Sequence, residues 1–202
     1  MSGWRHQQGT LAVYNEDHVD TDRIIPARFL SMVTRSGYGP LLFADVRGDS
    51  FVLDQPQAAG ATVLVVGTNF GCGSSREHAV WAIQQAGFVA VVARRESASP
   101  GFSDIFRQNA SNCGLLLIEL DPESHDQVAQ AGTGAAFSLN VENQTLDVGS
   151  HTISFELSPA AKRQVMEGLD LIGKTLELAS AIDDYEKRST AFVPPVLQEP
   201  RA

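Results

Sequence analysis

The segment Val63–Ala93, VLVVGTNFGCGSSREHAVWAIQQAGFVAVVA, changes its pattern twice along its length. Thr62–Val66 is a β-branched apolar run, typical of a strand buried on both faces. Gly67–Gly73 contains three glycines, so its backbone can turn sharply and lie close to a ligand. From Arg76 the apolar residues recur with helical spacing, and Phe88–Ala93 is a second apolar run. The segment predicts a βαβ unit whose loop lies at the carboxyl end of a strand, where open α/β sheets bind ligands.

The predicted loop leads into a helix start, where free N–H groups and a partial positive charge suit a carboxylate or a phosphate. Arg76 adds a planar, bidentate positive charge. No lysine follows Gly73, which excludes a Walker phosphate loop. The dinucleotide-binding fingerprint also fails, because Gly71-Cys72-Gly73 is followed by Ser74, Ser75 and Arg76, and its third glycine is missing. The pattern favours a carboxylate ligand over a nucleotide.

The same residues also fit a structural role. Ser74 and Glu77 have the spacing of a capping box, with Ser74 as N-cap and Glu77 at the third helical position. A serine that caps a helix has its hydroxyl engaged with backbone N–H groups, whereas a helix beginning at Ser75 leaves the Ser74 hydroxyl free to point into a site. His78 is expected on the helix surface or at a subunit contact.

Composition limits the classes of partner. The net charge of −9 disfavours nucleic acid, because phosphate backbones are bound by basic surfaces. It also means that a polycarboxylate requires arginines gathered locally. The only two cysteines, Cys72 and Cys113, argue against a disulfide framework and are too few to ligate an iron–sulfur cluster, so no metal site is expected on this chain.

The remaining sequence predicts one globular domain, residues 1–192, followed by a mobile tail, residues 193–202. Apolar runs stay well below the ~18 residues of a membrane span, and the N-terminus lacks a signal-peptide pattern, so the expected location is the cytoplasm, with no membrane partner. Further strands are expected at Thr10–Tyr14, Phe51–Leu53 and Leu115–Leu120, and a hairpin in residues 137–148.

Six motifs resemble, in the same order, those of the small subunits of 3-isopropylmalate dehydratase, which are swivelling domains of the aconitase superfamily. The resemblance runs from about Leu11 to about Ala191. The motifs are DTDRIIPARFL at Asp20–Leu30, VTRSGYG at Val33–Gly39, FVLDQP at Phe51–Pro56, NFGCGSSREHA at Asn69–Ala79, FSDIFRQNA at Phe102–Ala110 and EGLDLIGKTL at Glu167–Leu176.

The resemblance implies an α/β swivelling domain with β/β/α layers and a largely parallel central sheet. It also implies a hydro-lyase that moves a hydroxyl between neighbouring carbons by removing water and adding it back. The implied catalytic residues are Ser74 as the proton-abstracting base, Asp22 as its support and Arg76 as a carboxylate clamp. The implied substrate-binding residues are Asn69, Ser75, Arg76 and Arg35. From the sequence alone, Asp22 also reads as a turn-making aspartate.

The resemblance further implies a large-subunit partner that carries a [4Fe–4S] cluster. The implied reaction interconverts 2-isopropylmalate and 3-isopropylmalate in leucine biosynthesis. A departure from the family at Arg94–Pro100, read either as a surface loop or as a change at the mouth of the site, keeps open related hydratases of citraconate, dimethylmaleate or homoaconitate. A non-catalytic module that binds small anions is the alternative from another functional class.

Overall fold

The computed structural model describes residues 3–169 and 171–188. These fall into two compact units, which meet in sequence between residues 170 and 171. The first unit contains β1 (His6–Tyr14), α1 (Thr21–Ile24), β2 (Val63–Val66), α2 (Glu77–Gln85), β3 (Ala90–Arg94), α3 (Asp104–Cys113), β4 (Leu116–Leu120), α4 (Pro122–Ala131), β5 (Ala136–Asn140), β6 (Thr145–Val148), β7 (His151–Ser154) and α5 (Pro159–Glu167).

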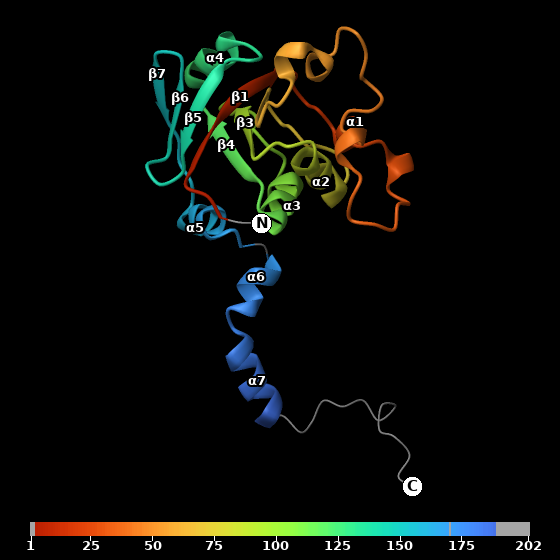
Figure 1. Cartoon of the computed structure of the whole chain (residues 1–202), viewed down its shortest axis with the longest axis vertical. Coiled ribbons are helices and arrows are strands. Elements are labelled where there is room, and N and C mark those ends of the chain that lie inside the picture. The colour runs from red at the N-terminus through yellow and green to blue at the C-terminus, as the bar shows by residue number, and fades with distance from the viewer. Residues whose placement is uncertain (1–2, 170, 189–202) are drawn as a thin grey trace. The chain divides into compact units, whose positions relative to one another are not determined.

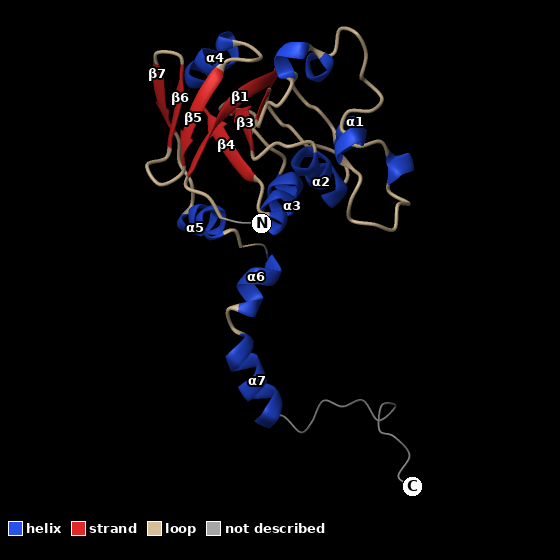
Figure 2. Cartoon of the chain, viewed as in Figure 1, coloured by secondary structure: helices blue, strands red, loops and turns tan. Residues whose placement is uncertain are grey.

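The described strands form one seven-stranded sheet in the order β4-β3-β2-β1-β5-β6-β7 (Figures 1 and 2). The first four strands are parallel, and Val63 in β2 is paired with Leu11 in β1 and Ala90 in β3. β5, β6 and β7 are antiparallel and joined as a meander. The predicted βαβ unit is confirmed as β2-α2-β3, and the α/β class with a parallel core is confirmed with it.

The sheet has an apolar core on each face, because neighbouring residues of a strand point to opposite sides. Leu64 and Val91 pack on one face with the buried residues of α2 and α3. Val63 and Val92 pack on the other with residues of α4, α5 and the antiparallel strands. Figure 1 shows α2 and α3 together on one side of the parallel strands. Continuous apolar strands are therefore needed at the centre of the sheet.

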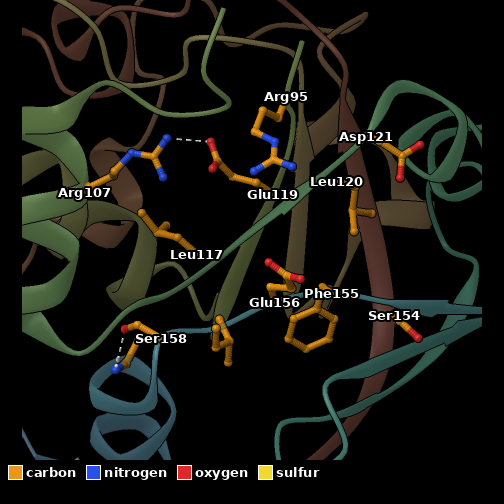
Figure 3. Close-up of a pocket in the computed structure, with 12 residues that line it drawn as sticks. Arg95, Arg107, Leu117, Glu119, Leu120, Asp121, Ser154, Phe155, Glu156 and Ser158 are labelled. Atoms are coloured by element: carbon orange, nitrogen blue, oxygen red, sulfur yellow. Dashed lines mark hydrogen bonds and ion pairs between the residues drawn. The ribbon is translucent and has the colours of Figure 1, made fainter. Parts of the chain in front are cut away.

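The antiparallel half of the sheet curls back towards the parallel half. A pocket of about 520 Å³ is lined by β4, at one end of the strand order, and also by residues 154–158, which include the end of β7 at the other end and the segment after it (Figure 3). Side chains of β5, β6 and β7 also share a core with one face of β2 and β3. The antiparallel strands therefore share the second face of the parallel strands with α4 and α5, while α2 and α3 cover the first.

The predicted capping box is wrong. α2 begins at Glu77, and its N-cap is Arg76 in an extended conformation with no capping side chain. The reason is tertiary: the Thr21 hydroxyl donates to the Ser74 carbonyl over 2.9 Å, and Cys72 forms a parallel bridge with Asp20. These contacts hold the segment before Arg76 in an extended path, so the helix starts later than its sequence pattern indicates.

The expected strand at Phe51–Leu53 is also wrong. Val52–Asp54 is a 3₁₀ turn, in which the Asp54 amide donates to the Phe51 carbonyl over 3.0 Å. Further 3₁₀ turns at Ala27–Phe29, Gly39–Leu41 and Pro56–Ala58 fill the long connection between α1 and β2. Both rings of the pair Tyr14 and Phe51 are buried, with centroids 5.3 Å apart, so this connection packs onto the end of β1.

Gly71 lies where the loop after β2 presses against α3. Its φ is +74°, and a Cβ placed there would lie 2.6 Å from Phe106 Cβ and closer still to the Phe106 ring. The Gly71 amide donates to the Val19 carbonyl over 2.8 Å, and its carbonyl accepts from the Ser103 hydroxyl over 2.6 Å. Only glycine satisfies both the left-handed backbone and this close approach.

Gly71→Ala is expected to lower the free energy of unfolding of this chain by about 2–5 kcal/mol, because a backbone cost of about 1–2 kcal/mol adds to an overpacking cost of about 1–3 kcal/mol. Gly60→Ala is the matched control, since Gly60 has φ +73° with open space around it and carries the backbone cost alone. Urea denaturation of both variants measures the difference. Equal losses would show that the contact with Phe106 relaxes without cost.

The second unit is described through α6 (Leu171–Leu176) and α7 (Ala179–Arg188). Within the part of this unit that the structure describes, the large apolar side chains that are exposed are Ile172, Leu176, Leu178, Ile182 and Tyr185. The domain boundary expected at residue 192 stays a prediction, and the tail expected at residues 193–202 lies outside the described residues. None of the helices that the structure describes is both long and apolar enough to cross a membrane.

Candidate functional site

Three loops meet beyond the carboxyl ends of the parallel strands. The loop after β1 reaches the loop after β2 through a parallel bridge between Asp20 and Cys72. The loop after β2 reaches the loop after β3 through a second bridge, between Phe70 and Phe102. Residues far apart in the sequence are thereby placed side by side at the edge of the sheet where α/β proteins bind ligands.

Ser74 and Ser75 are exposed at the end of the loop after β2, directly before Arg76. The Ser74 carbonyl accepts a hydrogen bond from the Thr21 hydroxyl, but neither serine hydroxyl has a hydrogen-bond partner among the described residues. The Ser74 hydroxyl is therefore neither buried nor used as a helix cap. It is available to a molecule bound in front of the loop.

Arg76 is held by Asp22 in an ion pair between Nη1 and Oδ1. The Arg76 side chain is 13% exposed and that of Asp22 54% exposed, so the pair lies at the boundary between protein and solvent. Arg76 Nη1 makes no hydrogen bond of normal geometry within the described chain. The guanidinium keeps donor capacity beside the uncapped start of α2, and both features favour a bound carboxylate.

Asn69 enters the same loop with a left-handed backbone, at φ +53°. Its amide nitrogen Nδ2 lies 3.0 Å from Nδ1 of His18, in the loop after β1. Its backbone N–H donates to the Pro100 carbonyl over 2.8 Å, which ties it to the loop after β3. Asn69 is thus the residue of the predicted site at which all three loops join.

Arg35 packs against α2. Its guanidinium lies 5.1 Å from the centre of the Trp81 ring, and its carbonyl accepts from the Gln85 side chain in the last turn of α2. The structure joins the loops that carry Asp22, Asn69, Ser74, Ser75 and Arg76, and in the described chain Arg35 makes no hydrogen bond or ion pair with these residues.

The two cysteines are free and carry raised pKa values. Burial raises the pKa of the Cys72 thiol, and the Asp20 carboxylate adds to this. Burial and the adjacent Glu77 carboxylate raise the pKa of Cys113 to about 12. Neither is a ready thiolate, and the described residues contain no group of three or more His, Cys, Asp or Glu side chains that could hold a metal. The described part of this chain therefore does not fit an iron–sulfur cluster.

The loop after β3 divides into two parts. Arg94 pairs with Glu96 and, over 2.7 Å, with Asp126 in α4, so its charge is balanced by these two carboxylates. The carbonyl of Pro100, in contrast, accepts hydrogen bonds from the Thr68 hydroxyl and the Asn69 amide, over 3.0 and 2.8 Å. The segment Arg94–Pro100, which departs from the family pattern, therefore contacts the predicted site through the backbone carbonyl of Pro100.

Glu119 in β4 holds the end of this loop by accepting hydrogen bonds from its backbone. Its Oε1 accepts from the Gly101 amide and from Arg107 Nη2, both over 2.6 Å, and from the Phe102 amide over 3.3 Å (Figure 3). Burial alone would raise the pKa of Glu119, but the Arg107 guanidinium and the two amides together outweigh it and lower the pKa. The pocket in Figure 3 contains Glu119 and Arg95 but none of the predicted site residues.

Glu119→Gln is expected to lower the free energy of unfolding by about 1–3 kcal/mol near pH 7, because charged hydrogen bonds are lost. A carboxylate with a lowered pKa stabilises the fold above its unfolded pKa of about 4.3, and this contribution is lost as the pH falls through the folded pKa. The difference from the unsubstituted chain should therefore shrink below about pH 4.5.

Urea denaturation across this pH range measures the effect of Glu119→Gln. Glu156→Gln is the control, because Glu156 is exposed and makes no hydrogen bond in the described chain. A loss that stays constant with pH would assign the effect to packing and not to charge.

Sequence reasoning did not find His18, Thr21 or Glu119, which hold the loop from segments distant in the chain. It also did not find His125, a fully buried residue whose Nε2 donates to the Val66 carbonyl over 2.7 Å, at the end of β2. Burial lowers the pKa of His125, which keeps the ring neutral. His125 stands in a mainly polar run of the sequence, Asp121–Gln127, so its neighbours gave no signal that it is buried.

The chain is similar to known proteins in both its sequence and its fold. The Aconitase C-terminal domain family matches residues 1–123, which include the predicted Ser74 loop. A crystal structure of 3-isopropylmalate dehydratase from Methanocaldococcus jannaschii superposes with a TM-score of 0.66 at 27% identity, over 90% of this chain and 99% of that one. The similarity therefore covers both the parallel and the antiparallel parts of the sheet.

Curated relatives agree over almost their whole length. The 3-isopropylmalate dehydratase small subunit of Koribacter versatilis is 42% identical over 93% of this chain and 98% of its own length. The small subunit of Corynebacterium jeikeium is 39% identical over 96% and 97%, and that of Bacillus cereus is 35% identical over 95% and 100%. With its loop, helix start and sheet order, this chain belongs to the family of 3-isopropylmalate dehydratase small subunits, within the Aconitase C-terminal domain family.

Proposed function

We propose that this chain is the small subunit of a hydro-lyase that interconverts 2-isopropylmalate and 3-isopropylmalate in leucine biosynthesis. The observation that carries the proposal is the exposed Ser74 hydroxyl next to Arg76, at the uncapped start of α2. Likeness to small subunits over nearly the whole chain supports the substrate and the reaction. A biosynthetic pair of this kind acts in the cytoplasm.

Dehydration requires a base that removes a proton from the carbon next to a carboxylate. A serine hydroxyl is a weak base, so the site must stabilise its anion. The free N–H groups at the start of α2 and the charge of Arg76 provide that stabilisation. Ser74 is the base in this proposal, and its exposure lets it reach a substrate on the surface of the chain.

The other residues of the loop position the substrate. Arg76 binds a substrate carboxylate, with Asp22 holding the guanidinium in place. Ser75 donates a hydrogen bond to the substrate, and Asn69 shapes the pocket. Arg35, whose guanidinium lies over the Trp81 ring, recognises the variable part of the substrate.

Half of the active centre lies on another chain. The leaving hydroxyl needs an acid, and the open iron of a [4Fe–4S] cluster acts as a Lewis acid of this kind. The proposal therefore requires a large subunit that binds the cluster and docks against the exposed Ser74 loop. The substrate is a small dicarboxylate, which local arginines bind despite the overall charge of −9.

Reconstitution tests the proposal. The chain is mixed with a cluster-loaded large subunit and offered 3-isopropylmalate, citraconate, dimethylmaleate and homoaconitate. Turnover of 3-isopropylmalate with the highest kcat/KM is the expected result. A higher kcat/KM with another acid would replace the substrate, and tight binding of small acids without any large-subunit complex would favour a non-catalytic module.

A further inference from the structure

His18 has no role in the site described so far, although it directly contacts Asn69 of the predicted substrate site. Its Nδ1 lies 3.0 Å from Nδ2 of Asn69, although the two residues are 51 positions apart in the sequence. The His18 side chain is exposed at the same edge of the sheet as Ser74. The contact therefore joins the loop after β1 to the loop after β2 at the surface that meets the substrate.

The backbone on both sides of this contact is constrained. His18 has φ +54° and Asn69 has φ +53°, a left-handed conformation that residues other than glycine adopt infrequently. The His18 amide donates to the Thr68 carbonyl over 2.8 Å, and its carbonyl accepts from the Cys72 thiol over 3.4 Å. Backbone strain of this type is maintained where the surrounding structure requires it, and it is concentrated at functional sites.

Hydrogen-bond chemistry determines what the pair presents to a ligand. The Asn69 Nδ2 group is only a donor, so His18 Nδ1 must be the acceptor and the ring carries its proton on Nε2. The amide oxygen Oδ1 of Asn69 then has no partner within the described residues and remains free to accept. With the opposite tautomer, Asn69 would have to turn its amide round and present N–H groups instead.

We propose that His18 is a positioning residue that fixes the Asn69 amide with Oδ1 towards the substrate, where it accepts a hydrogen bond from the substrate hydroxyl. The inference rests on the proposed function for the identity of the substrate. It assigns His18 a task that the motif resemblance does not, and it gives Asn69 a defined chemical role as an acceptor. Two carboxylates flank His18 in the sequence: Asp17, which accepts from the Thr68 amide, and Asp20, which caps α1.

A double-mutant cycle on the reconstituted pair tests the coupling. His18→Leu removes the acceptor and is expected to lower kcat/KM about tenfold, mainly through KM, which is the size of one hydrogen bond. His18→Asn places an amide oxygen near the position of Nδ1 and should restore activity to within about twofold. In an Asn69→Ala background, His18→Leu should have almost no further effect.

The second measurement uses the small subunit alone. Long-range ¹⁵N–¹H spectra should report the Nε2–H tautomer of His18 in the unsubstituted chain and a mixture of tautomers in Asn69→Ala. Finding the Nδ1–H tautomer, or additive effects in the cycle, would overturn the proposal. If the unsubstituted pair turns over no substrate, the proposed function fails, and the tautomer measurement still decides whether His18 orients Asn69.

Discussion

Ser74→Ala should lower kcat/KM of the reconstituted pair by at least about 10²–10⁴-fold, the usual contribution of a positioned base. The loss should fall on kcat, because the carboxylate clamp at Arg76 is unchanged. The fold should tolerate the change: Ser74 is exposed, and the bond it does make, from Thr21, uses its backbone carbonyl. Steady-state kinetics with 3-isopropylmalate measure the loss, and thermal unfolding should differ by no more than about 0.5 kcal/mol.

Ser97→Ala is the matched control for this experiment. Ser97 is an exposed serine in the loop after β3, outside the group of residues assigned to the site, so its substitution should leave kcat unchanged. Ser75→Ala should give a smaller loss than Ser74→Ala, expressed in KM, since a substrate hydrogen bond is removed without removing the base. Comparable turnover in Ser74→Ala and in the unsubstituted pair would reject Ser74 as the base.

Arg76→Lys should lower kcat/KM by about 10²–10³-fold, even though it keeps the positive charge. Lysine lacks the planar fork that binds a carboxylate through two parallel hydrogen bonds, and it cannot donate to Asp22 and a substrate in the same way. A loss of 10²–10³-fold corresponds to about 2.7–4.1 kcal/mol, which lies within the about 2–5 kcal/mol that a disrupted, partly buried charge pair costs. The expected change is in both KM and kcat, because the guanidinium binds the substrate and stabilises the serine anion.

Arg163→Lys provides the comparison for Arg76. Arg163 pairs with Glu167 one turn away on α5, and both side chains are exposed, so its replacement should leave turnover unaffected.

Asp22→Asn distinguishes orientation of Arg76 from support of the serine base. If Asp22 only orients Arg76, this variant should raise KM and leave the pH dependence of kcat intact. An Arg76→Lys enzyme with unchanged KM would show that the substrate carboxylate binds elsewhere.

The parts of the structure that were predicted from sequence depend on local patterns. Apolar runs at Val63–Val66 and Ala90–Arg94, with helical spacing between them, predicted β2-α2-β3 correctly. The hairpin expected in residues 137–148 likewise forms, as the antiparallel pair β5-β6. Each of these signals lies within one or two turns of the element that it defines, so no distant residue was needed to read it.

The start of α2 could not be read in this way. Ser74 and Glu77 have the spacing of a capping box, yet the box does not form, because Thr21 binds the Ser74 carbonyl from 53 positions away. The supposed strand at Phe51–Leu53 failed for a similar reason, since its apolar residues pack as a turn against Tyr14. The roles of the predicted site residues remain predictions that the kinetic experiments above will decide.

The amino-acid sequence by itself determined a βαβ unit whose first strand leads into a glycine-rich loop with a serine pair and an arginine. Hydrophobic periodicity and glycine act over a few residues, so these features are independent of the rest of the chain. Only the tertiary structure decided that Ser74 is free, that Asp22 holds Arg76 and that His18 meets Asn69. Those contacts join loops about fifty residues apart, and they arise only when parallel pairing brings the ends of β1, β2 and β3 to one edge.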